Sequence, residues 1–281
     1  MNEVDLHKII ASIDEELKSE QIPIPGRPMH AFLRLSERLQ IQITSRPDDK
    51  IYNFVIKWFD KKYGNRLKVD HSQGEIAILI RNDLYKMRIP LFYGQARLLS
   101  DPNRMSIDAA QIGTGPEPLT INVLNLIDGF TTGYARELSP IEHKELVLYL
   151  KWGLDSFQLI NTQKSSKYTV AALSDLRSAV YHLFIRPQHC GQSKWASSQA
   201  AEKFVKSYIE RKGKRVDRHH NLNTLSEVAY ALGLNLLNPD NLEVIRCEAG
   251  VRYGESAVSV QEAVEAHHAS IDVCAKVASS M

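Results

Sequence analysis

The chain has 281 residues, of which 43% are hydrophobic and 24% are charged, and its 35 basic residues nearly balance its 33 acidic ones. The length exceeds one average domain, and the composition is that of an ordinary globular protein, which excludes the fibrous and disordered classes. Because the formal charge of the whole chain is only +2, a nucleic-acid site would have to be a local basic patch.

The cysteine content predicts a reducing compartment. Cys190, Cys247 and Cys274 stand far apart and form no C-x-x-C pair, so neither a disulfide framework nor a zinc site is expected. The N-terminus carries acidic residues and lacks the long apolar core of a signal peptide. No apolar run is long enough to span a bilayer. We therefore expect a cytoplasmic protein with no membrane segment, metal or cofactor.

Amphipathic helices are predicted in the first part of the chain. Apolar residues recur at helical spacing over residues 6–17, 29–43 and 51–59. The first two segments are separated by three prolines, Pro23, Pro25 and Pro28, which predict an extended connector.

The pattern then changes to the alternation that is typical of β-strands. Residues 75–80 and 85–91 alternate apolar and polar side chains, and Asn82-Asp83 between them suits a two-residue hairpin turn. Together with residues 66–70, these segments predict a small antiparallel sheet of about three or four strands. The polar segment 100–118 is predicted to be a long loop.

Helices are predicted again over residues 119–133 and 139–160. The sequence Ser-Pro-Ile-Glu at 139–142 has an N-cap serine, a proline at the first helical position and a glutamate that closes a capping box. The polar segment 162–167 is the predicted domain boundary. Residues 1–162 are therefore predicted to form an α+β domain of unknown role, with helices around a small antiparallel sheet.

A second, all-α domain is predicted over residues 167–281. Apolar residues recur at helical spacing in five segments, 173–183, 195–209, 222–232, 238–249 and 259–278. Ser259 and Glu262 form a capping box for the last segment. The short connections favour an up-and-down bundle.

Spaced motifs within this bundle resemble a known family. Gln199-Ala200-Ala201-Glu202-Lys203 is followed by Lys206, a basic loop, the pattern H-x-L-x-x-L at residues 220–225, and Arg252-Tyr253. This arrangement resembles the HEPN domain over about residues 167–281. The resemblance implies a bundle of about five helices that forms homodimers. It also implies a bacterial nucleotide-binding or RNA-cleaving protein of the defence or toxin–antitoxin type, whose partner catalytic domain is either on a separately encoded protein or absent.

A basic patch within the bundle supplies candidate phosphate ligands. Eight lysines and arginines lie between residues 194 and 218, against three acidic residues, and clustered cations displace counterions from phosphates. The alternative is a solvated helix end. With the resemblance, the predicted nucleotide- or phosphate-binding residues are Lys203, Lys206, His220, Arg252 and Tyr253. An arginine supplies a planar fork for phosphate and a tyrosine a stacking face, although an interhelical salt bridge and a core tyrosine are the alternatives for the last two.

Catalysis is the second question that the resemblance raises. RNA-cleaving members carry an arginine followed after four to six residues by a histidine, and two such pairs occur here, Arg177 with His182 and Arg215 with His220. Cleavage without a metal needs a base for the 2′-hydroxyl and a cation for the developing phosphate charge. Both pairs lie outside the third bundle helix, where the family motif is expected, so a surface arginine and a packed histidine are the alternatives.

The leading prediction is a cytoplasmic nucleotide- or RNA-binding protein that acts through a HEPN-like bundle. A metal-independent endoribonuclease is one alternative. A protein-interaction or dimerisation module without catalysis is the other. Salt-dependent RNA binding separates the first two from the third, because phosphate contacts weaken steeply as salt rises.

Overall fold

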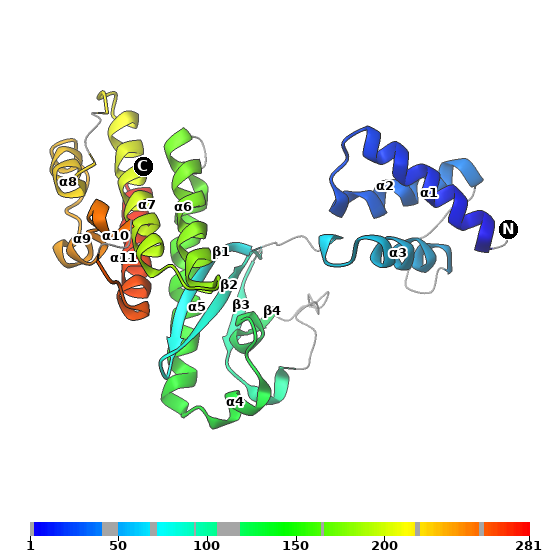
Figure 1. The fold of residues 1–281 in the computed structure, drawn as a ribbon, viewed down its shortest axis with the longest axis horizontal. Helices are drawn as coiled ribbons and strands as arrows, with labels where there is room; N and C mark the ends of the chain where they lie inside the picture. Colours follow the sequence, from blue (N-terminus) through cyan, green and yellow to red (C-terminus); the bar gives the residue numbers. More distant parts are fainter. Residues whose placement is uncertain are drawn as a thin grey trace. The chain divides into compact units, whose positions relative to one another are not determined.

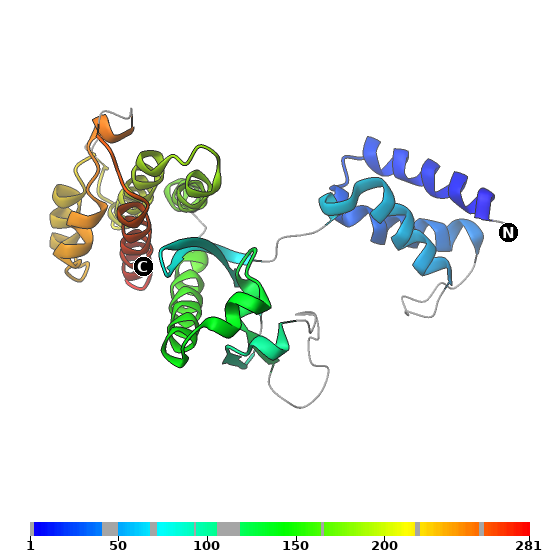
Figure 2. The ribbon, with the colours of Figure 1, turned by 60° about the horizontal axis from the view of Figure 1, so that its bottom comes forward.

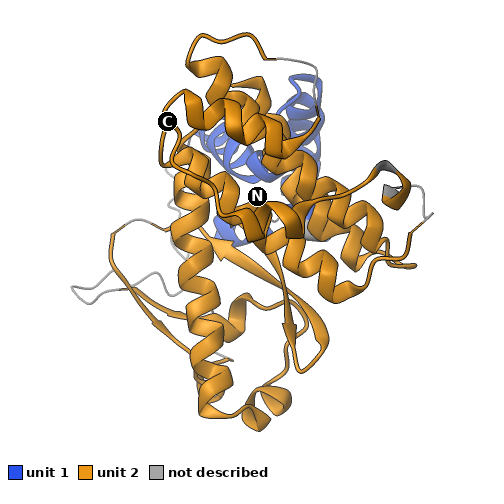
Figure 3. Ribbon diagram, turned by 90° about the vertical axis from the view of Figure 1, so that its left-hand side faces the viewer, with its two compact units in different colours: residues 1–71 blue, residues 72–281 orange. Residues whose placement is uncertain are grey.

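The computed structural model describes two compact units, residues 1–71 and 72–281 (Figure 3). The described residues are 3–40, 50–67, 72–92, 94–105, 119–163, 166–216, 220–252 and 256–281. The fold is of the α+β class, as the sequence predicts, with small sheets and a helical C-terminal region.

The first unit is helical (Figure 1). Its elements are α1 (Glu3–Ser19), η1 (Ile24–Gly26), α2 (Arg27–Leu39), α3 (Lys50–Tyr63) and η2 (Gly64–Leu67). The three α-helices confirm the three predicted ones. The extended connector is shorter than expected: Pro23 has an extended backbone before η1, whereas Pro25 and Pro28 lie in the first turns of η1 and α2, where proline fits because no backbone N–H is needed.

A buried carboxylate joins the helices of this unit. The side chain of Asp14 in α1 is fully buried, and its Oδ2 accepts hydrogen bonds from Lys62 Nζ and from the Tyr63 hydroxyl, each at 2.6 Å. Arg27 of α2 lies 3.6 Å from Oδ1 and donates to the same hydroxyl. Because the partners come from α2 and α3, this cluster fixes the three helices relative to one another.

Two pairs of strands begin the second unit. β1 (Ser72–Ile80) and β2 (Asp83–Pro90) form an antiparallel hairpin, whereas β3 (Ala96–Leu99) and β4 (Leu119–Asn122) form a separate parallel pair. The antiparallel sheet is therefore confirmed with two strands, fewer than expected. A parallel pair needs a long connection, and the segment between β3 and β4 supplies it.

Some local predictions in this region are wrong. The hairpin turns at Arg81 and Asn82, whose φ values are 51° and 70°, because Asp83 pairs with Ile80. Residues 119–133, predicted to be one helix, form β4, η4 (Val123–Leu126) and the start of α4 (Thr132–Glu137). A short apolar run fits either a strand or a helix, and pairing with β3 decides between them. Of the strand expected over residues 66–70, residues 66 and 67 belong to η2 instead, and residues 68–70 lie outside the described residues.

Helix α5 (Pro140–Thr162) packs against the hairpin, which lies across it in Figure 2. Its predicted capping box is confirmed, since the Ser139 and Glu142 side chains each accept the other's backbone N–H. Gly153 faces the hairpin, and a Cβ there would lie 2.5 Å from Ile89 Cδ1. Glycine therefore permits the close approach of α5 to the sheet.

Helices make up the rest of the unit (Figure 1). They are α6 (Lys167–Phe184), α7 (Cys190–Arg211), α8 (Leu222–Ala231), α9 (Pro239–Ile245), α10 (Ala249–Arg252) and α11 (Val260–Ala278). Helices α6 and α7 pack along each other, and both contact α11. The capping box of Ser259 and Glu262 is present at the start of α11 as predicted.

The polar segment at 162–167 lies inside the second unit, whereas the compact units divide at 71–72. One buried apolar cluster includes residues of the hairpin, α5, α6, α7 and α11. Two polar contacts also cross the predicted boundary: the His268 ring donates to the Ala77 carbonyl, and the Trp152 indole donates to Asp272, each at 2.7 Å. The hairpin and α5 thus share a core with the bundle.

Candidate functional site

Glu202 of α7 lies among the predicted binding residues. Its side chain is 4% exposed, and its Oε1 accepts a hydrogen bond from Lys206 Nζ at 2.6 Å. The ring of His220, in the connection before α8, places Nδ1 3.0 Å from the same oxygen. Gln199 donates to Oε2. The structure therefore brings Lys206 and His220 together through a buried carboxylate.

Lys203 has a carboxylate partner as well. It hydrogen-bonds Asp175 of α6. Burial raises the pKa of Asp175, and the Lys203 ammonium opposes that rise. Since Lys203 and Lys206 are both neutralised by carboxylates, they add little positive potential for a phosphate group. Their geometry fits a positioning role, in which α7 is tied to α6 and to His220.

The remaining predicted binding residues are only partly described. Arg252 ends α10, and its side chain lies outside the described part of the chain, as does the whole of Tyr253.

The two arginine–histidine pairs differ in their surroundings. Arg177 and His182 stand five residues apart on α6, so their side chains point about 140° apart around the helix axis. Burial and the neighbouring His189 lower the pKa of His182. Arg215 is exposed, and the residues between it and His220 include 217–219, which lie outside the described residues. For this second pair, the structure gives a contact for His220, with Glu202, and none between Arg215 and His220 within the described residues.

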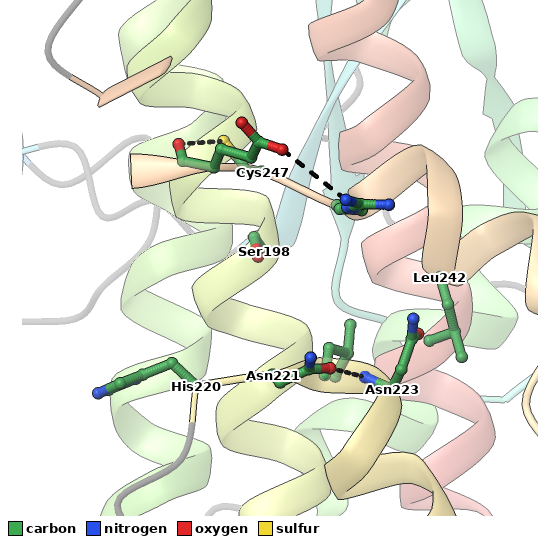
Figure 4. A pocket seen from close by; sticks show the side chains of 9 residues that line it. Ser198, His220, Asn221, Asn223, Leu242 and Cys247 are labelled. Carbon is green, nitrogen blue, oxygen red and sulfur yellow. Dashed lines mark hydrogen bonds and ion pairs between the residues drawn. The ribbon is translucent and has the colours of Figure 1, made fainter. Parts of the chain in front are cut away.

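A pocket of about 390 Å³ adjoins His220 (Figure 4). It lies between α7, the start of α8 and the segment from α9 to α10, and it is lined by Ser198, His220, Asn221, Leu222, Asn223, Leu242, Arg246, Cys247 and Glu248. Asn221 is the N-cap of α8, and its Oδ1 accepts the backbone N–H groups of Asn223 and Thr224. The NH₂ group of Asn221 is thus not used in the cap. This volume is in the range of small-molecule sites.

Cys247 lies on the upper side of the pocket in Figure 4, and the preceding residue, Arg246, also lines the pocket. The Arg246 guanidinium makes long ion pairs with Glu243 at 3.6 Å and Glu248 at 3.7 Å. Burial raises the pKa of the Cys247 thiol and outweighs the opposite effect of Lys194. A thiol that stays protonated is a poor nucleophile, so Cys247 fits a pocket that binds a ligand better than one that attacks it.

Exposed cations follow directly after α7. We call Arg211, Lys212, Lys214 and Arg215 the basic segment; all four are exposed. Within the described residues none of them forms an ion pair, although Arg211 donates to Gln163 and the Lys212 ammonium lies 5.0 Å from the Tyr208 ring centroid. The local positive charge that the sequence predicts therefore lies at this end of α7.

Sequence reasoning missed most of the pocket. An asparagine directly before an apolar helical pattern is a recognisable N-cap, so Asn221 had a local signal. Asn223, Arg246 and Cys247 had none, because only the tertiary packing of α7, α8 and α9 brings residues 246–248 close to Ser198.

Two absences within the described residues bear on the class of site. No group of three histidine, cysteine, aspartate or glutamate side chains there could hold a metal ion. None of the described helices is both long enough and apolar enough to cross a bilayer.

The fold and site define an α+β protein whose second unit combines a helical bundle with a polar pocket and a basic segment. No protein-family model matches the sequence, and comparisons with curated proteins and with solved structures found no match. The HEPN resemblance therefore stays a prediction that depends on the spacing of the motifs.

Proposed function

We propose that the second unit binds RNA or a nucleotide in the pocket beside His220, with phosphate groups at the basic segment. One observation carries this proposal: a polar pocket of nucleotide size follows, within a few residues along the chain, four exposed cations that have no described carboxylate partner. Clustered cations of this kind supply most of the affinity for nucleic-acid phosphates.

The pocket walls provide the second part of the recognition. The Asn221 amide and the Arg246 guanidinium present donors of the kind that bind base edges and phosphate oxygens. The ion pairs of Arg246 are long and 61% of its side chain is exposed, so exchanging them for a phosphate costs little. Lys203 and Lys206 hold Asp175 and Glu202 instead, which changes their predicted role from binding to positioning.

The HEPN resemblance supports the same proposal. It implies a homodimer, a partner catalytic domain that is either separately encoded or absent, and a cytoplasmic role in bacterial defence or a toxin–antitoxin system. Each of these is an expectation from the motifs at residues 199–206, 220–225 and 252–253.

Anisotropy of a fluorescein-labelled 12-nucleotide RNA tests the proposal. Changing Lys214 and Arg215 together to glutamine should weaken binding and lower the salt slope by about 2, since each phosphate contact contributes roughly 1. Arg246→Gln should weaken binding about tenfold, which corresponds to the loss of one charged hydrogen bond. Lys18→Gln removes one exposed cation from the first unit and serves as the charge-matched control for Arg246→Gln. A wild-type protein that shows no salt-dependent binding contradicts the proposal.

A second candidate function, RNA cleavage without a metal, is favoured by the orientation of His220. The buried Glu202 holds Nδ1 of a ring whose side chain is 75% exposed, which leaves Nε2 directed away from the carboxylate. A histidine oriented in this way can accept the proton of a 2′-hydroxyl. Incubation of RNA in EDTA, at protein concentrations that saturate binding of each variant, should give cleavage that His220→Gln abolishes. Intact RNA with the wild-type protein removes this candidate.

A further inference from the structure

We propose that the end of α6 forms a second RNA-contacting surface, on which unpaired bases of single-stranded RNA stack. The inference rests on the proposed function and names its substrate class. We call this the stacking surface and define it by Arg177, Tyr181, Phe184, Arg186 and His189, all of which are exposed. It shares no residue with the pocket beside His220.

Two aromatic rings form the centre of the stacking surface. Tyr181 is 63% exposed and Phe184 is 39% exposed, although the opposite side of the same helix is fully buried. At 100° per residue, Arg177, Tyr181 and Phe184 fall within about 60° around the helix axis. The three side chains therefore share one outward face, with Tyr181 about one turn after Arg177 and Phe184 about one turn after Tyr181.

The charge pattern around these rings favours a polyanion. Between residues 176 and 201 the sequence contains no aspartate or glutamate, but it contains Arg177, Arg186 and Lys194. Asp175, the nearest preceding acid, is bound to Lys203. Neither Arg177 nor Arg186 forms an ion pair within the described residues. Along this segment of the chain, a phosphate backbone thus meets cations and no carboxylate.

Local contacts support the Tyr181 ring. The backbone N–H of His189 donates to the His182 carbonyl at 2.9 Å, and the two imidazoles stack with centroids 6.1 Å apart. The Tyr181 ring meets the His182 ring edge-on at 5.8 Å. Because burial and His189 keep the pKa of His182 low, this histidine packs as a neutral ring and the arginines carry the charge. A preordered face loses little entropy when a base stacks on it.

This chemistry distinguishes single strands from duplexes. The faces of paired bases are already covered by their neighbours in a helix, whereas unpaired bases can stack on aromatic side chains whatever their sequence. Exposed rings flanked by arginines therefore suit single-stranded RNA without sequence preference.

Anisotropy titrations of the full chain with labelled 12-nucleotide oligouridylate and with a 12-base-pair RNA duplex test the proposal. Tyr181→Ala and Phe184→Ala should each weaken single-strand binding by about fivefold or more, as expected for one lost base stack, without a change for the duplex. Tyr181→Phe keeps a ring and should retain affinity. Val170→Ala removes an exposed apolar side chain from the same helix and is the matched control.

Three outcomes would overturn the proposal. Alanine variants that bind oligouridylate as tightly as the wild type, while the Lys214/Arg215 variant binds weakly, would remove the stacking surface and leave the proposed function intact. A wild-type protein that binds neither RNA would remove both. Unchanged RNA affinity with a lower sedimentation mass for Tyr181→Ala would show that this face joins two copies of the chain. Because both rings are exposed, circular dichroism melting should show that the variants fold.

Discussion

Because Glu202 and Lys206 form a buried ion pair, the stability of the bundle depends strongly on Glu202. Both side chains are at least 92% buried, so Glu202→Ala would leave the Lys206 ammonium buried without its partner. We expect the free energy of unfolding to fall by about 3–5 kcal/mol, the usual effect of breaking a buried pair. Urea denaturation followed by circular dichroism measures this loss. Replacing both residues by methionine should restore much of it, and a loss below about 1 kcal/mol for Glu202→Ala would contradict the pairing.

His267 predicts how stability depends on pH. It is fully buried in α11, and within the described residues neither ring nitrogen makes a hydrogen bond of ordinary geometry. Burial lowers its pKa to about 3; the nearby His268 adds to this effect, and the backbone of Glu75 opposes it. An unfolded histidine has a pKa of about 6.5, so between these values the unfolded chain binds a proton that the folded chain excludes. Stability is therefore greatest above pH 6.5 and falls as the pH approaches 3.

Between these two pKa values, we expect His267 to lower the free energy of unfolding by up to about 1.4 kcal/mol for each unit that the pH falls. The pKa values of His182 and His268 are lowered as well, in the same direction. The melting temperature should decrease from pH 7.5 to pH 6 and again to pH 5, and this decrease should be smaller in His267→Leu. A profile that is flat over this range in the wild type would show that the ring is protonated in the folded state.

At the scale of elements, the sequence predicts helices better than strands. Ser139 and Ser259 each start a helix with a capping box, because a local serine–glutamate pattern carries the whole signal. The parallel pair of β3 and β4 has no such local signal. Its strands are four residues long, and their pairing depends on contacts across a long connection. A short apolar segment such as 119–122 therefore takes its conformation from its partner.

The candidate site shows the same division between local and tertiary information. Glu202 and Lys206 stand four residues apart, a spacing that suits an ion pair on one helix, and the structure contains this pair. The spacing does not show that this pair is buried, which depends on how α6, α8 and α11 cover α7. For that reason the sequence assigned Lys206 to phosphate binding, whereas Arg246 and Asn223 in the pocket went unrecognised.

The contact of α5 with the hairpin gives a prediction at this scale. In Gly153→Ala the new methyl group would meet Ile89 Cδ1 at 2.5 Å, and we expect a loss of about 1–3 kcal/mol, typical of overpacking. Gly133→Ala in α4 is the matched control, because a Cβ there meets nothing within 4 Å, and it should stabilise slightly. Urea denaturation measures both variants. Ile89→Val combined with Gly153→Ala should recover part of the loss; equal effects of the two glycine changes would contradict the close approach.

At the scale of the whole molecule, the apolar clusters distinguish the two possible domain boundaries, one at residues 71–72 and one at residues 162–167. The first unit has its own apolar cluster, formed by α1, α2 and α3. The cluster of the second unit runs from the hairpin through α5 to α11 without a break at residues 163–166. A polar linker in the sequence marks a domain boundary only when few contacts cross it. Here α5 packs on α11 across that linker.

Two fragments test these boundaries, and the structure predicts different stabilities for them. Residues 72–281 keep the hydrogen bonds of His268 with Ala77 and of Trp152 with Asp272, and they should unfold in one cooperative transition. Residues 167–281, the bundle predicted from the sequence, lose these bonds and expose the apolar face that α5 and β1 cover. Because this face belongs to the core, we expect a urea midpoint well below that of the longer fragment, or association at micromolar concentration. Equal midpoints with a monomeric sedimentation mass would instead place the folding boundary at residues 162–167, and the hairpin and α5 would then be an appendage of an autonomous bundle.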